Sequence, residues 1–233
     1  MTDSGRYSRQ TMLTEIGEAG QWKISGVSVL IVGLGGLGAP VAIYLAGAGV
    51  GRLGLCDPDT VSESNLQRQV LYDGATIGHP KVVIAARRIS ALNPDVTTEL
   101  HDAGLTPGNA ADIISRYDYV VDCCDNFATR YLIDDTCAAL GKTWVYGSIG
   151  EFTGQVAVIN GSSATRYSTL YPDREALCSR PSRVRGVLGP VPGVVGAIEA
   201  SETLKLITGA GEPLDGKLFT IDLLTMTTNL IYF

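Results

Sequence analysis

The chain has 233 residues, of which 45% are hydrophobic and 18% charged, so it is long enough for one sizeable α/β domain with a buried core. Its net charge of −6 disfavours a nucleic-acid partner. The five cysteines show no disulfide-framework spacing and no C-x-x-C pair, which favours a cytoplasmic protein without a Cys/His zinc site. The uncharged run 27–51 is rich in glycine and contains a proline, so we expect no membrane span and no membrane partner.

In chain order, apolar runs that are typical of buried strands alternate with helical patterns. Strands are predicted at 29–32, 52–56, 96–100, 119–123 and 143–146, and helices at 40–48, 81–92, 110–115 and 127–140. This alternation predicts a Rossmann-like, doubly wound and mostly parallel sheet with helices on both faces.

The last third of the chain has a different pattern. Strands at 155–159 and within 218–232, which we expect to be antiparallel, flank a predicted helix at 194–207. The segment 161–192, which is rich in proline and arginine, lies between the strand at 155–159 and this helix. A structureless connection of that length inside a compact domain is typical of a functional or mobile segment.

A glycine-rich motif follows the first predicted strand, where four apolar residues lead into the pattern Gly-x-Gly-x-x-Gly. Its glycines are Gly33, Gly35, Gly36 and Gly38, and a predicted helix begins directly after them. Glycines let the backbone approach a phosphate, and the start of a helix offers unpaired N–H groups. Asp57 lies 19 residues past the last glycine, at the end of the next strand, where a carboxylate meets a nucleotide ribose. The motif therefore predicts nucleotide binding.

Three more polar patches fall near the carboxyl ends of predicted strands, where ligands bind to open α/β sheets. They are 57–69, Lys81 and 122–126. Arg68 and Lys81 supply positive charge for a polyphosphate, and Asp125 is a candidate magnesium ligand. Each also has an ordinary interpretation, as a surface cation, a solvated lysine and a helix cap. Their joint placement around one crevice favours the functional interpretation.

These motifs resemble those of the ThiF/MoeB/HesA-type adenylyltransferases, which are relatives of the ubiquitin-activating enzymes. The resemblance runs from Arg6 to about Leu206, and the Asn-Leu-Gln-Arg-Gln run with its downstream Pro-Lys is its most specific part. The matching segments are Arg6–Gln10, Gly33–Gly38, Asp57–Asp59, Ser64–Gln69, Gly78–Lys81, Asp122–Asn126 and Gly186–Pro190.

The resemblance implies a reaction and the residues that serve it. Members of the family bind Mg²⁺ and ATP together with the C-terminal glycine of a ubiquitin-like protein, whose carboxylate attacks the α-phosphate to give an acyl adenylate and pyrophosphate. By position, Gly36 lies against the nucleotide, Asp57 holds the ribose, Asp125 binds magnesium, and Arg9 reaches the ATP of the other subunit in a homodimer. The remaining expected nucleotide-binding residues are Gly33, Gly35, Gly38, Asp59, Asn65, Gln67, Arg68, Lys81 and Asn126, and the expected catalytic residues are Arg9, Arg68, Lys81 and Asp125.

On this basis we expect a single adenylation domain over residues 1–233. Residues 1–26 are expected to form a helical segment that contacts the second subunit. Residues 27–150 form the nucleotide-binding half, and 151–233 form the carrier-binding half with its crossover segment 161–192.

The sequence departs from the family pattern in two places. Many bacterial members hold a structural zinc with two C-x-x-C pairs. The first pair would fall near Arg166–Thr169, which has no cysteine, and the second beyond Phe233, so no structural zinc is expected. Some members also use a cysteine for sulfur transfer where Ser182 stands here. The nearest thiol, Cys178, is either an incidental loop cysteine or a sulfur-transfer thiolate activated by neighbouring arginines.

The leading hypothesis is the ATP-dependent adenylation of a ThiS-like sulfur carrier protein for thiamin thiazole synthesis, with a separate sulfur donor. A MoaD-like carrier of molybdopterin synthesis is the next alternative, followed by another carboxylate substrate. An NAD-dependent dehydrogenase shares the glycine motif, but it would not need Asn65, Arg68, Lys81 and Asp125 together. A catalytically inactive scaffold is a further alternative, against which the intact phosphate and magnesium set argues.

Overall fold

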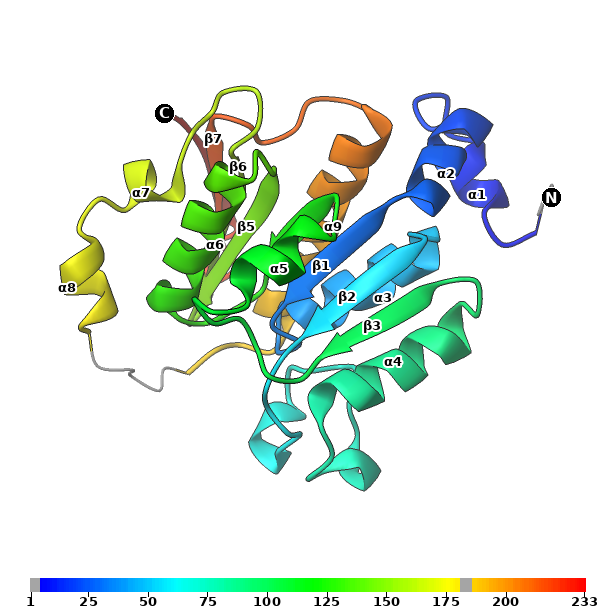
Figure 1. Cartoon of the computed structure of the whole chain (residues 1–233), viewed down its shortest axis with the longest axis horizontal. Helices are drawn as coiled ribbons and strands as arrows, with labels where there is room; N and C mark the ends of the chain where they lie inside the picture. The colour runs from blue at the N-terminus through cyan, green and yellow to red at the C-terminus, as the bar shows by residue number, and fades with distance from the viewer. Residues whose placement is uncertain (1–4, 181–185) are drawn as a thin grey trace.

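The chain folds around one eight-stranded sheet in the computed structural model, which describes residues 5–180 and 186–233 (Figure 1). The strands are β1 (Ser28–Val32), β2 (Arg52–Cys56), β3 (Thr97–His101), β4 (Tyr119–Asp122), β5 (Trp144–Gly150), β6 (Thr153–Ile159), β7 (Lys217–Asp222) and β8 (Thr227–Tyr232). Their order in the sheet is β3-β2-β1-β4-β5-β6-β7-β8. Strands β1 to β5 are parallel, and β6, β7 and β8 pair antiparallel with their neighbours. The predicted fold class is therefore confirmed.

Helices cover both faces of this sheet. They are α1 (Ser8–Thr11), α2 (Gly17–Gly26), α3 (Gly38–Ala48), α4 (Lys81–Leu92), α5 (Ala110–Ser115), α6 (Phe127–Ala139), α7 (Tyr167–Leu170), α8 (Arg174–Cys178) and α9 (Pro190–Thr208), with short 3₁₀ helices η1 (Glu63–Asn65) and η2 (Gly74–Thr76). Helices α3, α4 and α9 share one hydrophobic cluster, and α5 and α6 belong to the cluster on the opposite face. Within the described residues, no helix has the length and hydrophobicity needed to cross a membrane.

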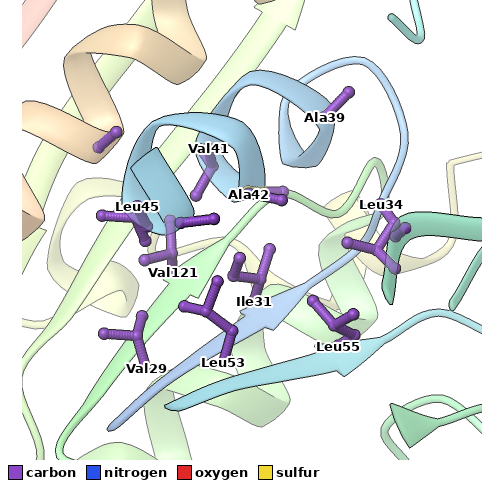
Figure 2. Packing of buried hydrophobic residues seen from close by; sticks show 14 of the residues in the cluster. Val29, Ile31, Leu34, Ala39, Val41, Ala42, Leu45, Leu53, Leu55 and Val121 are labelled. Carbon is purple, nitrogen blue, oxygen red and sulfur yellow. The ribbon is translucent and has the colours of Figure 1, made fainter. Parts of the chain in front are cut away.

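The central strands are buried on both faces, which explains their uninterrupted apolar sequences. Neighbouring side chains of a strand point to opposite faces, so Ile31 packs under α3 while Leu30 joins the cluster of α5 and α6. Figure 2 shows Ile31 and Leu53 below Val41 and Leu45 of α3. This helix carries no charge, because most of its surface is covered by the sheet and by α9.

Several element boundaries differ from the sequence-based expectations. Helix α9 begins at Pro190 rather than at 194, since proline has no N–H to lose at the first position of a helix. Strand β5 continues to Gly150, because its last residues pair with β6 in an antiparallel ladder. The crossover segment 161–192 contains α7 and α8, although part of it lies outside the described residues. The described part of the segment 1–26 contains the helices α1 and α2, and its contact with a second subunit stays a prediction.

The parallel strands β1, β2 and β4 end at the same edge of the sheet, and helices α3 and α6 begin there. Helices α1 and α2 lie at the opposite end of the sheet, beside the point where β1 begins (Figure 1). Hydrogen bonds place them there, because Arg6 donates to the carbonyl of Leu92 at the end of α4 and Gln10 donates to that of Ala48 at the end of α3.

Candidate active site

The glycine turn between β1 and α3 is shaped by close backbone contacts. Gly33 has a φ of +94°, and a Cβ at this position would lie 2.6 Å from the carbonyl oxygen of Cys123. A Cβ at Gly38 would lie 2.0 Å from the carbonyl oxygen of Gly33. Among the described residues, the amides of Gly35 and Gly36 have no acceptor. Two free N–H groups close to the start of a helix can bind an anion.

Asp57 directly follows β2 and supports the glycine turn. Its carboxylate accepts hydrogen bonds from the amide of Leu34 at 2.7 Å and from the amide of Asp59 at 2.8 Å. The residue is only 5% exposed. Burial raises the pKa of this carboxyl group, while the Lys81 ammonium and the two amides oppose the rise. The predicted ribose ligand is thus already oriented by the turn that is expected to hold the phosphates.

Lys81 points its ammonium group between two carboxylates beside the same turn. Its Nζ lies 2.8 Å from Oδ2 of Asp59 and 3.8 Å from Oδ2 of Asp57. The lysine side chain is 6% exposed, whereas that of Asp59 is 66% exposed. Because the carboxylate of Asp59 is exposed, a bound phosphate can take its place as the partner of the buried Lys81 ammonium. The interpretation of Lys81 as a solvated helix residue is therefore wrong.

The segment that carries Asn65, Gln67 and Arg68 folds as η1 and a following turn. The side-chain oxygen of Asn65 accepts a hydrogen bond from the amide of Ser62, and Arg68 donates to the carbonyl of Ser64 at 2.9 Å. A Cβ on Gly36 would lie 3.8 Å from Cδ of Arg68, so the stem of this arginine runs along the glycine turn. Gln67 is exposed and lies 3.5 Å from the carbonyl of Val187.

The amino end of α9 closes the side of the glycine turn. A Cβ on Gly36 would lie 3.0 Å from Cβ of Pro192, and one on Gly189 would lie 2.6 Å from the carbonyl oxygen of Gln67. The motif Gly186–Pro190 therefore belongs to the same site as the glycine turn, although it lies about 150 residues away in the sequence.

The loop between β4 and α6 presents Asp125 to solvent. Asp125 makes no hydrogen bond or ion pair with the described residues. The cap of α6 is Asn126, whose oxygen accepts from the amide of Thr129 at 2.9 Å. The alternative that Asp125 is the helix cap is therefore wrong, and the oxygen of Asn126 is already engaged within the chain.

A single free carboxylate fits the way in which magnesium binds beside phosphates. Mg²⁺ usually keeps one or two protein carboxylates and completes its coordination with phosphate oxygens and water. Asp125 meets this requirement. The described residues contain no group of three or more His, Cys, Asp or Glu side chains that could hold an ion without a nucleotide.

Arg9 does not reach this edge of the sheet within its own chain. Arg9 is exposed on α1, and the next residue, Gln10, donates a hydrogen bond to the carboxyl end of α3. The glycine turn lies at the amino end of α3, and this 11-residue helix is about 16 Å long at 1.5 Å per residue. Arg9 is thus separated from the other predicted site residues.

Cys178 lies at the exposed end of α8, which packs against α6. The nearby Arg174 is engaged elsewhere, because it forms a 2.6 Å ion pair with Asp135 and lies over the ring of Tyr131. Ser182 falls outside the described residues. Among the described residues no hydrogen bond links Cys178 to an arginine, although Arg174 interacts with it electrostatically. The role of Cys178 in sulfur transfer stays a hypothesis.

The positions of the expected first zinc pair are occupied by other interactions. Arg166 forms a two-pronged ion pair with the buried Asp134 at 3.0 and 3.1 Å, and Tyr167 is fully buried. This ion pair fastens the crossover segment to α6. The absence of a structural zinc stays a prediction.

Two residues at the site were missed by sequence reasoning. The hydroxyl group of Tyr72 donates a hydrogen bond to the carbonyl of Leu34 at 2.8 Å and so stabilises the backbone of the glycine turn. Gln69 is buried against Gly35. Gln69 belongs to the recognised Asn-Leu-Gln-Arg-Gln run and could have been found there, whereas nothing in the sequence distinguishes Tyr72 from a core tyrosine.

The chain is similar to known proteins along nearly its whole length. Residues 7–232 match the model of the ThiF family. The chain is 45% identical over 225 residues to the sulfur carrier protein adenylyltransferase of Thermus thermophilus, an alignment that covers 94% of this chain and 83% of that protein. It is 42% identical over 231 residues to the probable adenylyltransferase/sulfurtransferase MoeZ of Mycobacterium tuberculosis. This second alignment covers 97% of the chain but only 59% of the mycobacterial protein.

Among solved structures, the fold is similar to that of MccB from E. coli in its complex with ATP. The TM-score is 0.83 at 22% sequence identity, and the match covers 98% of this chain and 71% of MccB. At this identity the likeness concerns the fold.

Proposed function

The chain belongs to the ThiF family and is an adenylyltransferase, and from this premise we propose that it activates the C-terminal glycine carboxylate of a ubiquitin-like sulfur carrier protein. In this reaction the carboxylate attacks the α-phosphate of ATP, which gives an acyl adenylate and releases pyrophosphate. Use of ATP is supported by the names of the adenylyltransferase relatives.

The observation that carries the proposal is that groups able to bind phosphate lie together at one edge of the sheet. The free amides of Gly35 and Gly36, the buried ammonium of Lys81 and the stem of Arg68 converge there. Asp125 stands at the carboxyl end of a neighbouring strand with its carboxylate free. A nicotinamide dinucleotide site does not need these additional cations beside the glycine turn.

The chain's residues act by positioning and by neutralising charge. The nucleophile is already a carboxylate at neutral pH, so the site needs no general base. We propose that Lys81 and Arg68 offset the negative charge that develops on the transferred phosphate and on pyrophosphate, and that Asp57 fixes the ribose. Magnesium bound at Asp125 would supply further charge neutralisation on the phosphates.

We propose that residues 151–233 form the carrier-binding half. Strand β8 is exposed along its whole length and forms the edge of the sheet. Its side chains include Leu230, Ile231 and Tyr232, the last of which is 71% exposed. An exposed edge strand that carries apolar side chains can serve as a docking surface for another protein. Residues 27–150 would then bind the nucleotide, and 1–26 would contact a second subunit.

The carrier is proposed to be ThiS-like, with a separate sulfur donor, in the cytoplasm. A MoaD-like carrier is the second candidate, since the relatives include MoeZ, an adenylyltransferase and sulfurtransferase by name. The Thermus relative is named for a sulfur carrier without a stated pathway, so its name agrees with both candidates.

Intact-mass spectrometry of candidate carriers tests the substrate. Purified enzyme, ATP and Mg²⁺ are incubated with a ThiS-like carrier, a MoaD-like carrier, and each carrier without its last glycine. The proposal expects an AMP adduct on the ThiS-like carrier first and none on the shortened forms. A faster adduct on the MoaD-like carrier would select the alternative, and adducts on neither would reject carrier activation.

A further inference from the structure

The loop that carries Asp125 is held at its base by a buried ion pair. Asp122 ends β4 and Arg130 lies in α6, and their side chains are 0% and 7% exposed. Nε of Arg130 donates to Oδ2 of Asp122 at 3.2 Å. The pair is therefore fully formed inside the protein, directly behind the exposed loop.

Both members of the pair also bind the backbone of the residue that precedes Asp125. The amide of Cys124 donates to Oδ1 of Asp122 at 3.0 Å, and its carbonyl accepts from an Nη of Arg130 at 2.8 Å. The same Nη lies 3.3 Å from the carbonyl of Gly147 in β5. Arg130 thus ties the loop to two neighbouring strands, and Cys124 is held on both sides.

The surroundings of Arg130 leave its guanidinium little freedom. The group lies over the rings of Phe127 and Tyr146, at 5.8 and 5.5 Å from their centres. Burial raises the pKa of Asp122, whereas the guanidinium opposes that rise. A buried ion pair is weak evidence for net stabilisation, because desolvation offsets much of the attraction. The guanidinium of Arg130 donates hydrogen bonds to both Asp122 and the carbonyl of Cys124, which points instead to a role in orienting the loop.

We propose that Arg130 is a positioning residue for the magnesium ligand: through Asp122 and Cys124 it sets the direction of the Asp125 carboxylate. This inference rests on the proposed function, in which Asp125 meets Mg²⁺ and ATP. Asp125 has no hydrogen-bond or ion-pair partner among the described residues, so the backbone held at Cys124 is what sets the direction of its Cα–Cβ bond, from which the carboxylate extends.

The test variant is Arg130→Lys, which keeps the charge beside Asp122. One ammonium group cannot reproduce the planar fork that reaches Asp122, Cys124 and Gly147. ATP binding is measured by calorimetry in Mg²⁺ and in EDTA. We expect the affinity gained from Mg²⁺ to fall about tenfold in Arg130→Lys, while the affinity in EDTA changes less than twofold. An equal loss in both conditions would mean that Arg130 is only structural.

Two further variants separate positioning from stability. In the Asp125→Ala background, Arg130→Lys should cause no additional loss of the Mg²⁺-dependent gain, since both changes remove the same contact. The matched control is Arg166→Lys, which weakens the ion pair between the partly exposed Arg166 and the buried Asp134 of α6. It should lower the melting temperature without changing the Mg²⁺-dependent gain. A reduced gain in this control, or an additive effect with Asp125→Ala, would overturn the inference.

If Arg130→Lys does not fold, the double variant Asp122→Asn/Arg130→Gln takes its place. It replaces the ion pair by a neutral hydrogen-bonding pair and leaves no unpaired buried charge. The same tenfold loss is expected, and an unchanged gain would contradict the inference. Wild-type protein that binds ATP equally well in Mg²⁺ and EDTA would instead reject the magnesium site itself.

Discussion

Glu199 of α9 is a fully buried acid that the proposed reaction does not use. Its carboxyl group lies so close to Gly147 that a side chain there would overlap it, and Sγ of Cys123 is 3.9 Å from Oε1. Among the described residues, Oε2 has no hydrogen-bond partner. Burial, followed by the charge of Asp122, raises the pKa of Glu199 well above its usual value, and Arg130 opposes the rise. Burial therefore favours the neutral form of Glu199 in the folded protein.

This burial predicts a pH-dependent stability that Glu199→Gln should remove. A group whose pKa is raised on folding stabilises the protein fully below its unfolded pKa, and that contribution is lost as the pH rises through the folded value. The free energy of unfolding of the wild type, relative to that of Glu199→Gln, should therefore fall by up to about 1.4 kcal/mol per pH unit as the pH rises above 4.5, the usual pKa of a glutamate. Urea unfolding between pH 4.5 and 8 measures the difference.

The control for this experiment is Glu202→Gln on the same helix. Glu202 pairs with Lys205 and accepts a hydrogen bond from the amide of Leu214 at 2.7 Å. Its replacement should destabilise the protein, because it removes an ion pair. Parallel pH dependences of stability for wild type and Glu199→Gln would contradict a raised pKa of Glu199 in the folded protein.

At the scale of elements, helix α3 separates glycines with two different roles. A Cβ on Gly38 would lie 2.0 Å from the carbonyl oxygen of Gly33, whereas one on Gly47 would meet no atom within 4 Å. Gly38→Ala should destabilise the protein by about 3 kcal/mol and abolish ATP binding, because it distorts the turn. Gly47→Ala should stabilise it by about 0.5–1 kcal/mol. Thermal unfolding and ATP titration distinguish the two variants. Equal changes in melting temperature and in ATP affinity would contradict a close contact between position 38 and the carbonyl of Gly33.

The sequence predicts best those elements whose limits are set locally. Helix α4 was placed correctly at 81–92 because Pro80 precedes it and Asn93-Pro94 ends its pattern. The sequence predicts the start of α9 four residues too late, because Pro190 and Pro192 are typical of a loop. In the structure these prolines form the first turn of the helix, which packs against the glycine turn. The length of β5 depends on pairing with β6, which no local pattern reveals.

The same contrast holds for the candidate site. The glycine turn, Asp57 and Lys81 were predictable because their spacing follows from one strand-turn-helix-strand unit. Tyr72 and Arg130 were not, since their roles depend on which backbone carbonyl lies within reach in the folded chain.

At the scale of the whole molecule, Arg9 lies at the end of the sheet opposite to the glycine turn. If it acts on ATP, it must do so in a second subunit, and two-fold symmetry then gives each site one such arginine. Arg9→Ala and Asp125→Ala homodimers should each be nearly inactive, with about a hundredfold loss for the arginine. A mixed dimer carries both lesions in one site and leaves the other intact.

Mixing the two variants therefore tests the homodimer. Random pairing should restore about a quarter of the wild-type activity, because half of the dimers are mixed and each has one intact site. Size-exclusion chromatography of differently tagged chains controls for subunit exchange. If exchange is demonstrated and activity does not recover, Arg9 has no role in a neighbouring site.

The most direct test of carrier activation at this site is the exchange of labelled pyrophosphate into ATP. Wild-type enzyme with Mg²⁺ and a Gly-Gly-ended carrier should catalyse exchange, because adenylate formation is reversible. Omission of the carrier, removal of its last glycine, or Asp125→Ala should each lower the rate by at least about a hundredfold. Exchange that proceeds equally fast without a carrier, or undiminished in Asp125→Ala, would contradict the account.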